Sequence, residues 1–245
     1  MRSLILLTGF MVLISWGLVD VRVYAEDSKD KEVSESGKSL HVFLAAGGTR
    51  LREMDNVNSE LERYGYPALQ ERYFMMGGGL RFRIDRVIVG CEGHGFRSKP
   101  RDTDNYRVSM SGGYGVLEFG YDVIASGGFR LFPLIGIGGG GAQLNIYNKN
   151  DVTFSELMAN PGRGSQITSG GMIMNLSLGV EYFWKLVRSG GIVLGVQMGY
   201  NHSLTSGDWY LFSSQGEDST HVSGGPKLKL NGGYAHLTIG WRFLF

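Results

Sequence analysis

The 245-residue sequence has a single cysteine, Cys91, and only 5 prolines. One cysteine excludes an intrachain disulfide and a cysteine-rich metal site. A mean hydropathy of −0.07 and a charged fraction of 19% exclude a bundle of transmembrane helices, which requires several apolar runs of about 20 residues. The formal net charge of +1 gives no reason to expect nucleic-acid binding. Glycine, in contrast, is abundant: the 39 glycines are more than twice the usual share of about 7%.

The N-terminus carries a secretion pattern. Met1 and Arg2 precede an apolar run over residues 4–18, and small residues stand three and one positions before a cut after Ala25. This pattern predicts a cleaved signal peptide over residues 1–25, and the alternative is a retained anchor helix. Residues 26–37 are rich in charge and predict a flexible tail. The folded domain is then expected over residues 38–245.

Apolar residues alternate with small or polar ones in most of this domain. The alternation is strongest over residues 172–184, 192–200 and 235–245, and it is weaker over residues 41–48, 74–84, 87–96, 117–123 and 129–147. Period two is typical of β-strands, because successive side chains leave a strand on opposite sides. The sequence therefore predicts eight strands. The alternation slips after Gly139, which indicates a β-bulge.

The predicted strands are joined alternately by short and long connections. Short links surround Asp85, residues 126–128 and residues 188–190, and long ones cover residues 49–71, 97–106, 148–166 and 203–230. This asymmetry is typical of even-stranded antiparallel barrels in bacterial outer membranes. We therefore predict an all-β fold, an eight-stranded antiparallel up-and-down transmembrane β-barrel with its apolar face toward lipid. A soluble lipocalin-like carrier would instead turn that face inward.

Aromatic residues gather where the predicted strands meet the short links. Tyr182, Trp184 and Trp241 lie on the apolar face there, as an interfacial girdle requires. The glycine-rich face then belongs inside. An eight-stranded barrel has an interior that side chains fill, so small residues leave room for inward charged and aromatic groups.

The last thirteen residues, GYAHLTIGWRFLF, alternate and end in Phe245, and residues 132–139 read FPLIGIGG. In both features the sequence resembles small outer-membrane β-barrel proteins of the OmpA/OmpX-like kind. The resemblance implies an outer-membrane location in contact with lipid and lipopolysaccharide. It also implies that Phe243 and Phe245 form the signal that the barrel-assembly machinery recognises. It implies no particular activity.

Several charged residues fall on the polar face of their predicted strands, and so in the lumen: Arg81, Arg83, Glu92, Glu118, Asp122, Glu181 and Arg242. Unpaired buried charges are costly, so we expect these groups to pair. They form either a packed network that fixes strand register or a gated ion path. His94 and His236 are expected to join them, and their spacing does not resemble a metal site. No metal and no other cofactor is expected.

A catalytic alternative rests on His202 and Ser203, where some eight-stranded barrels modify lipid A. Adjacent residues of a strand point to opposite faces, so this pair cannot form a nucleophile and its base. Ser206 would have to return through a turn. A Gly-rich stretch at residues 136–141 matches G-x-G-x-x-G, but no helix pattern follows it, which argues against a dinucleotide site. We expect no enzymatic reaction.

The long loops are the expected place of interaction with extracellular ligands. Residues 51–69 predict a short helix that caps the barrel mouth, through either partner docking or simple loop folding. Trp209, Tyr210 and Phe212 of the last loop are candidate contact residues. The predicted function is that of a non-enzymatic outer-membrane barrel with a filled lumen and loops for surface interaction. The alternatives are a lipid A deacylase or acyltransferase and a narrow channel for small solutes.

Overall fold

The computed structural model describes residues 37–151, 153–159, 164–211 and 220–245. The predicted signal peptide, all but the last residue of the predicted tail and Phe212 lie outside these residues. Within them, no helix has the length and apolarity to cross a membrane.

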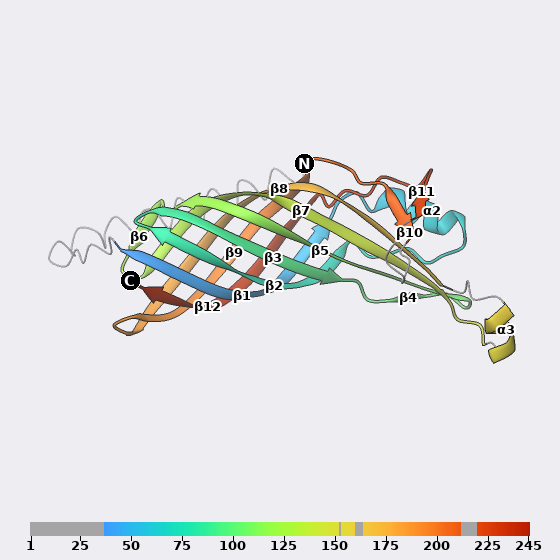
Figure 1. The fold of residues 1–245 in the computed structure, drawn as a ribbon, viewed down its shortest axis with the longest axis horizontal. Coiled ribbons are helices and arrows are strands. Elements are labelled where there is room, and N and C mark those ends of the chain that lie inside the picture. The colour runs from blue at the N-terminus through green and yellow to red at the C-terminus, as the bar shows by residue number, and fades with distance from the viewer. Residues whose placement is uncertain (1–36, 152, 160–163, 212–219) are drawn as a thin grey trace, which may run out of the picture. The chain divides into compact units, whose positions relative to one another are not determined.

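Eight long antiparallel strands form a closed ring (Figure 1). They are β1 (Lys38–Leu51), β2 (Arg72–Ile84), β3 (Val87–Arg97), β5 (Tyr106–Tyr121), β7 (Phe129–Asn148), β8 (Gly164–Val187), β9 (Gly190–Ser203) and β12 (Gly232–Leu244). Each pairs with its neighbour in the chain, and β12 pairs with β1 to complete the circuit. The eight-stranded barrel predicted from the alternation is confirmed.

The strands are staggered around the ring. Register partners followed once around the barrel from Leu40 lead back to β1 at Arg50, a stagger of ten residues. In a closed sheet this stagger requires the strands to tilt against the barrel axis. Tilt places side chains of distant strands at one level of the lumen.

Short turns lie at one end of the barrel and longer segments at the other (Figure 1). Asp85 joins β2 to β3 with a φ of 54°, and Gly127 and Gly128 turn between β6 (Ile124–Ser126) and β7 with φ values of 57° and 88°. Two successive positive φ values are what a tight type I′ hairpin requires. The long-loop end carries α2 (Asp55–Arg63), β4 (Arg101–Asp102), α3 (Phe154–Ala159), β10 (Trp209–Leu211) and β11 (Thr220–Val222).

Toward the short turns, the outward surface of the barrel is apolar. Its exposed residues include Val42, Leu80, Leu117, Ile137, Leu176, Leu194 and Ile239. The charged residues of the same strands point inward: Glu181 is 2% exposed and Arg242 is 1% exposed. The predicted orientation is confirmed, and the inside-out arrangement of a soluble carrier does not occur.

Toward the long loops, this polarity reverses. On β7 the outward Ile137 gives way to outward Gln143 and Asn145, whereas Ala142 and Leu144 on the inward face are each 4% exposed. The interior here is a hydrophobic core, made of residues such as Met75, Phe96, Met110, Leu144, Ile173 and Leu230. This end of the barrel therefore has the apolar interior and polar exterior of a water-soluble β-protein.

The reversal explains the slip in the sequence pattern after Gly139. Strand β7 keeps an unbroken register with β5 and with β8 through this region, so the predicted β-bulge is wrong. Apolar residues change faces here because the environment of the strand changes from lipid to water. Among the residues that the structure describes, the ring shows a register shift only between Lys185 and Val187.

Helix α2 covers the mouth of this core, as predicted for residues 51–69. Its Val57 and Leu61 are buried in the core. Asn58 holds the returning loop: its Nδ2 donates to the Leu69 carbonyl at 3.0 Å, and the Leu69 amide donates to its Oδ1 at 2.8 Å.

Trp209 was predicted to be a contact residue of the last loop, and this is wrong. Its side chain is 3% exposed and belongs to the hydrophobic core, and its Nε1 donates to the Pro226 carbonyl. A large apolar ring is stabilised more by burial than by exposure. Tyr210, the next residue, is 40% exposed.

Two neighbouring glycines of β7 predict opposite effects of adding a methyl group. A Cβ at Gly138 would collide with the Gly115 carbonyl oxygen, whereas a Cβ at Gly139 would approach only the Gly171 carbonyl, at 3.7 Å. We expect Gly138→Ala to reduce the yield of heat-resistant folded barrel on electrophoresis. Gly139→Ala is the matched control and should fold as well as the wild type. Equal yields of the two variants would show that the close approach of β5 to β7 at Gly138 does not limit folding.

Candidate functional site

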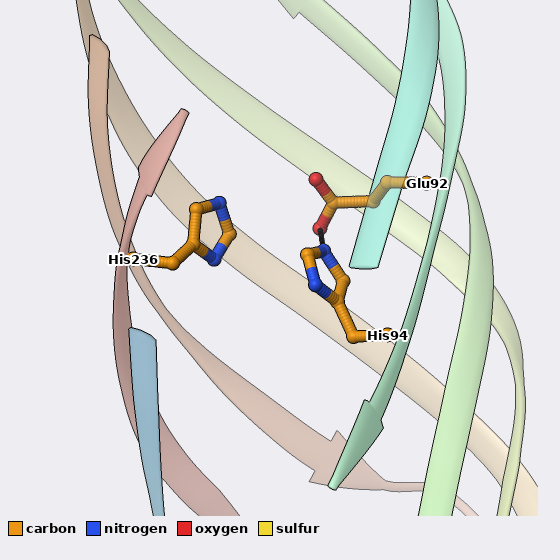
Figure 2. Close-up of side chains that lie close together, drawn as sticks. All are labelled: Glu92, His94 and His236. Carbon is orange, nitrogen blue, oxygen red and sulfur yellow. Dashed lines mark ion pairs between the residues drawn. The ribbon is translucent and has the colours of Figure 1, made fainter. Parts of the chain in front are cut away.

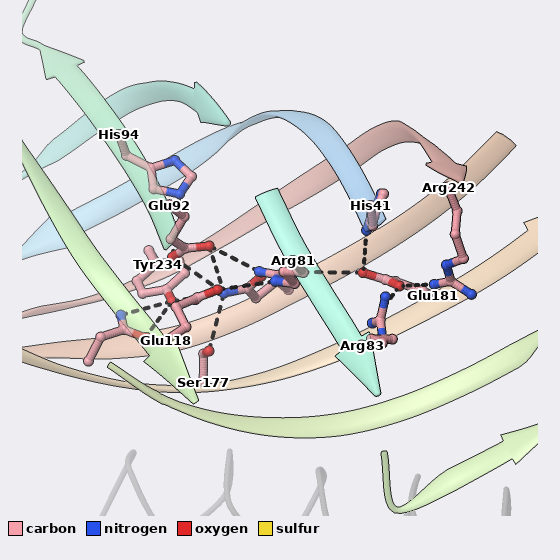
Figure 3. Close-up of polar contacts among 12 residues, drawn as sticks. His41, Arg81, Arg83, Glu92, His94, Glu118, Ser177, Glu181, Tyr234 and Arg242 are labelled. Atoms are coloured by element: carbon pink, nitrogen blue, oxygen red, sulfur yellow. Dashed lines mark hydrogen bonds and ion pairs between the residues drawn. The ribbon is translucent and has the colours of Figure 1, made fainter. Parts of the chain in front are cut away.

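The polar interior of the barrel is formed by inward positions of all eight long strands. All seven charged residues predicted for the lumen are at most 3% exposed. Figure 3 shows that six of them, Arg81, Arg83, Glu92, Glu118, Glu181 and Arg242, lie in one network along the lumen, and Asp122 joins this network through Arg83. We call these residues and their polar partners the lumen network. Its lower part, toward the short turns, lies around Glu181, and its upper part, toward the long loops, lies around Glu92.

Glu181 on β8 is the centre of the lower part. Arg242 Nη2 donates to its Oε2 at 2.7 Å and Arg83 Nη2 at 2.9 Å, while Arg81 Nη1 donates to its Oε1 at 3.3 Å. His41 Nδ1 lies 3.4 Å from the same Oε1. One carboxylate thus connects β8 to β1, β2 and β12.

Asp122 extends the lower part toward the short turns. Arg130 Nη1 donates to its Oδ2 at 2.6 Å, and Arg83 Nε lies 3.5 Å from the same atom. Arg130 and His41 were not among the predicted lumen residues. The alternation of their strands could have placed both in the lumen, because Arg130 lies on the same inward face as Phe132 and His41 lies on the same inward face as Phe43.

Arg81 links the two parts. Its Nη2 donates to Glu92 Oε2 at 3.1 Å and its Nε donates to Glu118 Oε2 at 3.1 Å. Gln197 accepts a hydrogen bond from Arg81 and donates from Nε2 to Glu92 and to the Ser177 hydroxyl. A single guanidinium therefore serves carboxylates from β3, β5 and β8.

The arginines also stack on inward aromatic rings. The Arg81 guanidinium carbon lies 4.4 Å from the ring centroid of Phe43, and that of Arg83 lies 5.0 Å from the centroid of Phe132. The guanidinium of Arg242 lies 5.0 Å from the centroid of Phe183. Cation–π contacts of this kind stabilise a desolvated cation and fill the space beside it.

Buried charge in the described barrel is balanced in number but not in position. The four buried arginines are Arg81, Arg83, Arg130 and Arg242, and the four buried acids are Glu92, Glu118, Asp122 and Glu181. In the upper part, Glu92 and Glu118 share Arg81, which also serves Glu181. In the lower part, three further arginines serve two carboxylates. The upper part therefore has fewer arginines than carboxylates.

Three potential metal ligands meet at the upper end: Glu92, His94 and His236. One ligand atom of each lies within 4.8 Å of the others, and all three side chains are buried (Figure 2). No metal pattern is visible in the sequence, because His236 lies far along the chain from the other two. Only closure of the ring brings β12 near β3.

The residues of the catalytic alternative do not meet in this way. His202 is exposed, whereas Ser203 is buried on the opposite face of β9, as adjacent strand residues must be. The Ser203 hydroxyl accepts a hydrogen bond from the Leu230 amide at 2.8 Å, and Asn231 accepts one from the Ser203 amide at 2.6 Å. Ser203 thus holds the last loop. Ser206 lies beyond the end of β9.

The predicted girdle and assembly residues lie on the outside of the barrel. Tyr182 and Trp184 are 41% and 45% exposed, with ring centroids 4.6 Å apart, and Trp241 is half-buried beside Phe243. Phe245 is 76% exposed, and its amide donates to the Lys38 carbonyl at 3.0 Å. Recognition by the assembly machinery remains a prediction.

A closed antiparallel ring with an apolar outward band and a charged interior defines a class of protein. It is the transmembrane β-barrel of bacterial outer membranes, with short turns on the periplasmic side and long loops outside the cell. The reversed end of the barrel, with its hydrophobic core and α2, is then the extracellular end.

Comparison with known proteins finds similar solved structures but no similar sequence family. No protein-family model and no curated protein matches this chain. The chain is similar to Ail, the attachment invasion locus protein of Yersinia pestis, at 10% identity and a TM-score of 0.47, over 86% of this chain and 99% of that chain. A major outer membrane protein of Thermus thermophilus has 10% identity and a TM-score of 0.47, over 85% and 99% of the two chains. OprG of Pseudomonas aeruginosa has 12% identity and a TM-score of 0.36, over 86% and 96%.

Proposed function

We propose that this protein is a closed, non-enzymatic outer-membrane barrel that presents a folded extracellular end for interaction. The observation that carries the proposal is that side chains fill the interior at two levels. The lumen network occupies the membrane-spanning part, and the hydrophobic core with α2 occupies the extracellular part. A water-filled path would need to cross both.

The extracellular end has features that suit contact with a partner. Strands β5, β7 and β8 extend together as an arm, in which Tyr106 of β5 pairs with Asn148 of β7 and Gly164 of β8 pairs with Tyr147, and α3 lies at its end (Figure 1). On α3, Phe154 is 77% exposed and Met158 is 61% exposed. These two exposed apolar side chains lie one helical turn apart and offer a small contact surface for a partner.

An ion pair holds β4 on the edge of this arm, where β4 pairs with β5. Arg107 donates from Nε and Nη2 to the two carboxylate oxygens of Asp102, at 2.8 and 3.1 Å. These hydrogen bonds hold the pKa of the Asp102 carboxyl below its ordinary value. The pair therefore keeps its charge in mildly acidic surroundings and orients β4 on β5.

Lipopolysaccharide is the proposed lipid partner of the outer surface. Exposed Arg72 and Arg97 lie at the extracellular ends of β2 and β3, and outward Phe74, the register partner of Arg97, is 62% exposed. Basic groups beside an apolar one at this end of the strands match the phosphates and acyl chains of that lipid. We also propose that the barrel-assembly machinery reads Phe243 and Phe245 during biogenesis.

Conductance tests the closed lumen. We expect the purified protein, reconstituted in planar bilayers, to produce no regular single-channel steps, because ions would have to cross a dry, paired interior. A trimeric porin reconstituted in parallel is the positive control. Regular steps that persist after repurification would contradict the proposal and favour the narrow channel.

A further inference from the structure

Two buried histidines in the membrane-spanning lumen lack hydrogen bonds. His94 is 4% exposed and His236 is 3% exposed, and neither ring nitrogen of either residue has a hydrogen-bond partner among the described residues. Buried polar atoms are almost always satisfied, by protein, water or a bound ion. Three nitrogens without any polar partner, beside a fourth whose nearest partner is the Glu92 carboxylate at 3.5 Å, point to a missing ligand.

One ligand atom from each of the two rings and from the carboxylate lies within 4.8 Å of the other two. His94 Nε2 lies 3.5 Å from Glu92 Oε1, and the rings of His94 and His236 stack with centroids 4.8 Å apart (Figure 2). The other oxygen of Glu92 receives the hydrogen bond from Arg81, so Oε1 remains directed toward the histidines. The cluster thus presents two nitrogens and one oxygen.

Glycines on neighbouring strands leave the space that the rings occupy. Gly77 is the register partner of His94, and a Cβ there would lie 2.5 Å from the His94 Nδ1. Gly47 is the register partner of His236, and a Cβ there would lie 2.6 Å from the His236 Cβ. A side chain at either position would collide with the neighbouring strand and with the adjacent histidine.

Local charge also favours a cation at this point. Glu92 and Glu118 are both buried beside Arg81, which they share with Glu181. A bound cation would therefore offset negative charge that Arg81 alone leaves uncompensated.

We propose that Glu92, His94 and His236 bind one divalent first-row transition-metal ion inside the barrel. Two imidazole nitrogens and one carboxylate oxygen are a common ligand set for zinc, and a water molecule completes the coordination. Zinc–ligand bonds of about 2.0–2.1 Å require the ligand atoms to move together by roughly an ångström. The side chains of the two histidines would have to rotate to supply that movement.

The ion would act as a cross-link. His94 and Glu92 belong to β3 and His236 belongs to β12, and β1 and β2 separate these strands in the ring. Because the hydrophobic core covers the site from outside, the ion enters while the barrel folds and exchanges slowly afterwards.

The test is metal content after refolding. Tag-free protein is refolded from urea into detergent with zinc or with EDTA, dialysed, and analysed by mass spectrometry for bound metal. We expect about one zinc per chain in the wild type, and at least a tenfold lower content in His94→Gln and in His236→Gln. The control His202→Gln changes an exposed histidine of β9 and should retain the ion. Gel mobility before and after boiling shows that each variant has folded.

A second measurement does not depend on the variants. Wild type refolded with Cu²⁺ should give an electron paramagnetic resonance spectrum with coupling to two nitrogens. Absence of stoichiometric metal from folded wild type, or equal metal content in His202→Gln and the two site variants, would overturn the proposal. A copper spectrum without nitrogen coupling would also overturn it.

Discussion

Replacement of Arg81 by methionine should lower the free energy of unfolding by about 3–5 kcal/mol, the cost of leaving buried charges without their partner. The Arg81 guanidinium donates to Glu92, Glu118 and Glu181, and it is 1% exposed. Methionine preserves much of the volume but leaves the upper carboxylates without a cation. The measurement is urea unfolding in lipid vesicles, followed by tryptophan fluorescence and by gel mobility.

Arg72→Met is the matched control, because Arg72 lies on the same strand and is exposed. We expect a change within about 0.5 kcal/mol for this surface position. The double variant Arg81→Met/Glu118→Gln should recover part of the loss, since it removes one of the unpaired charges. Equal stability of Arg81→Met and Arg72→Met would show that the lumen network does not support the fold.

Ile137→Arg should destabilise the barrel by about 1–2 kcal/mol, because its charged side chain would lie on the lipid face between the bilayer centre, where the cost is about 2–4 kcal/mol, and the water boundary. Ile137 is 52% exposed on the outward face of β7. Gln143→Arg lies on the same face of the same strand, beyond the apolar band. We expect it to be close to neutral, because water surrounds this part of the strand. Unfolding in vesicles measures both.

A third variant tests whether the inward face at the extracellular end is a hydrophobic core. Leu144 is 4% exposed in the extracellular core, and Leu144→Ala should cost about 2–5 kcal/mol. If Ile137→Arg and Gln143→Arg were equally destabilising, the apolar band would have to extend to the end of β7. The position of the membrane boundary derived from the fold would then be wrong.

The two halves of this barrel are stabilised by different means. In the membrane, lipid covers the apolar outside, so the inside must satisfy buried charges with one another, as Glu181 does with Arg83 and Arg242. In water, the apolar residues turn inward and are covered by α2. Both arrangements close the lumen, which is why the proposed function lies at the extracellular surface rather than in transport.

Much of the fold could be predicted from sequence because strand alternation is local. The patterns in β8, β9 and β12 show which face of each strand is apolar, and the short links at Asp85, residues 126–128 and residues 188–190 separate the hairpins. The prediction of a bulge after Gly139 is wrong because it also rested on this local alternation alone. A change of environment along a regular strand produces the same change of pattern as an extra residue.

The order of residues along the chain is enough to specify the number of strands, their alternating faces and the inward position of residues such as Arg81 and Glu181. These properties depend on neighbours along the chain. Which charges pair, and the meeting of His94 with His236, depend instead on how the ring closes. Closure with a ten-residue stagger brings together side chains from strands far apart in the chain, and no local pattern encodes that stagger.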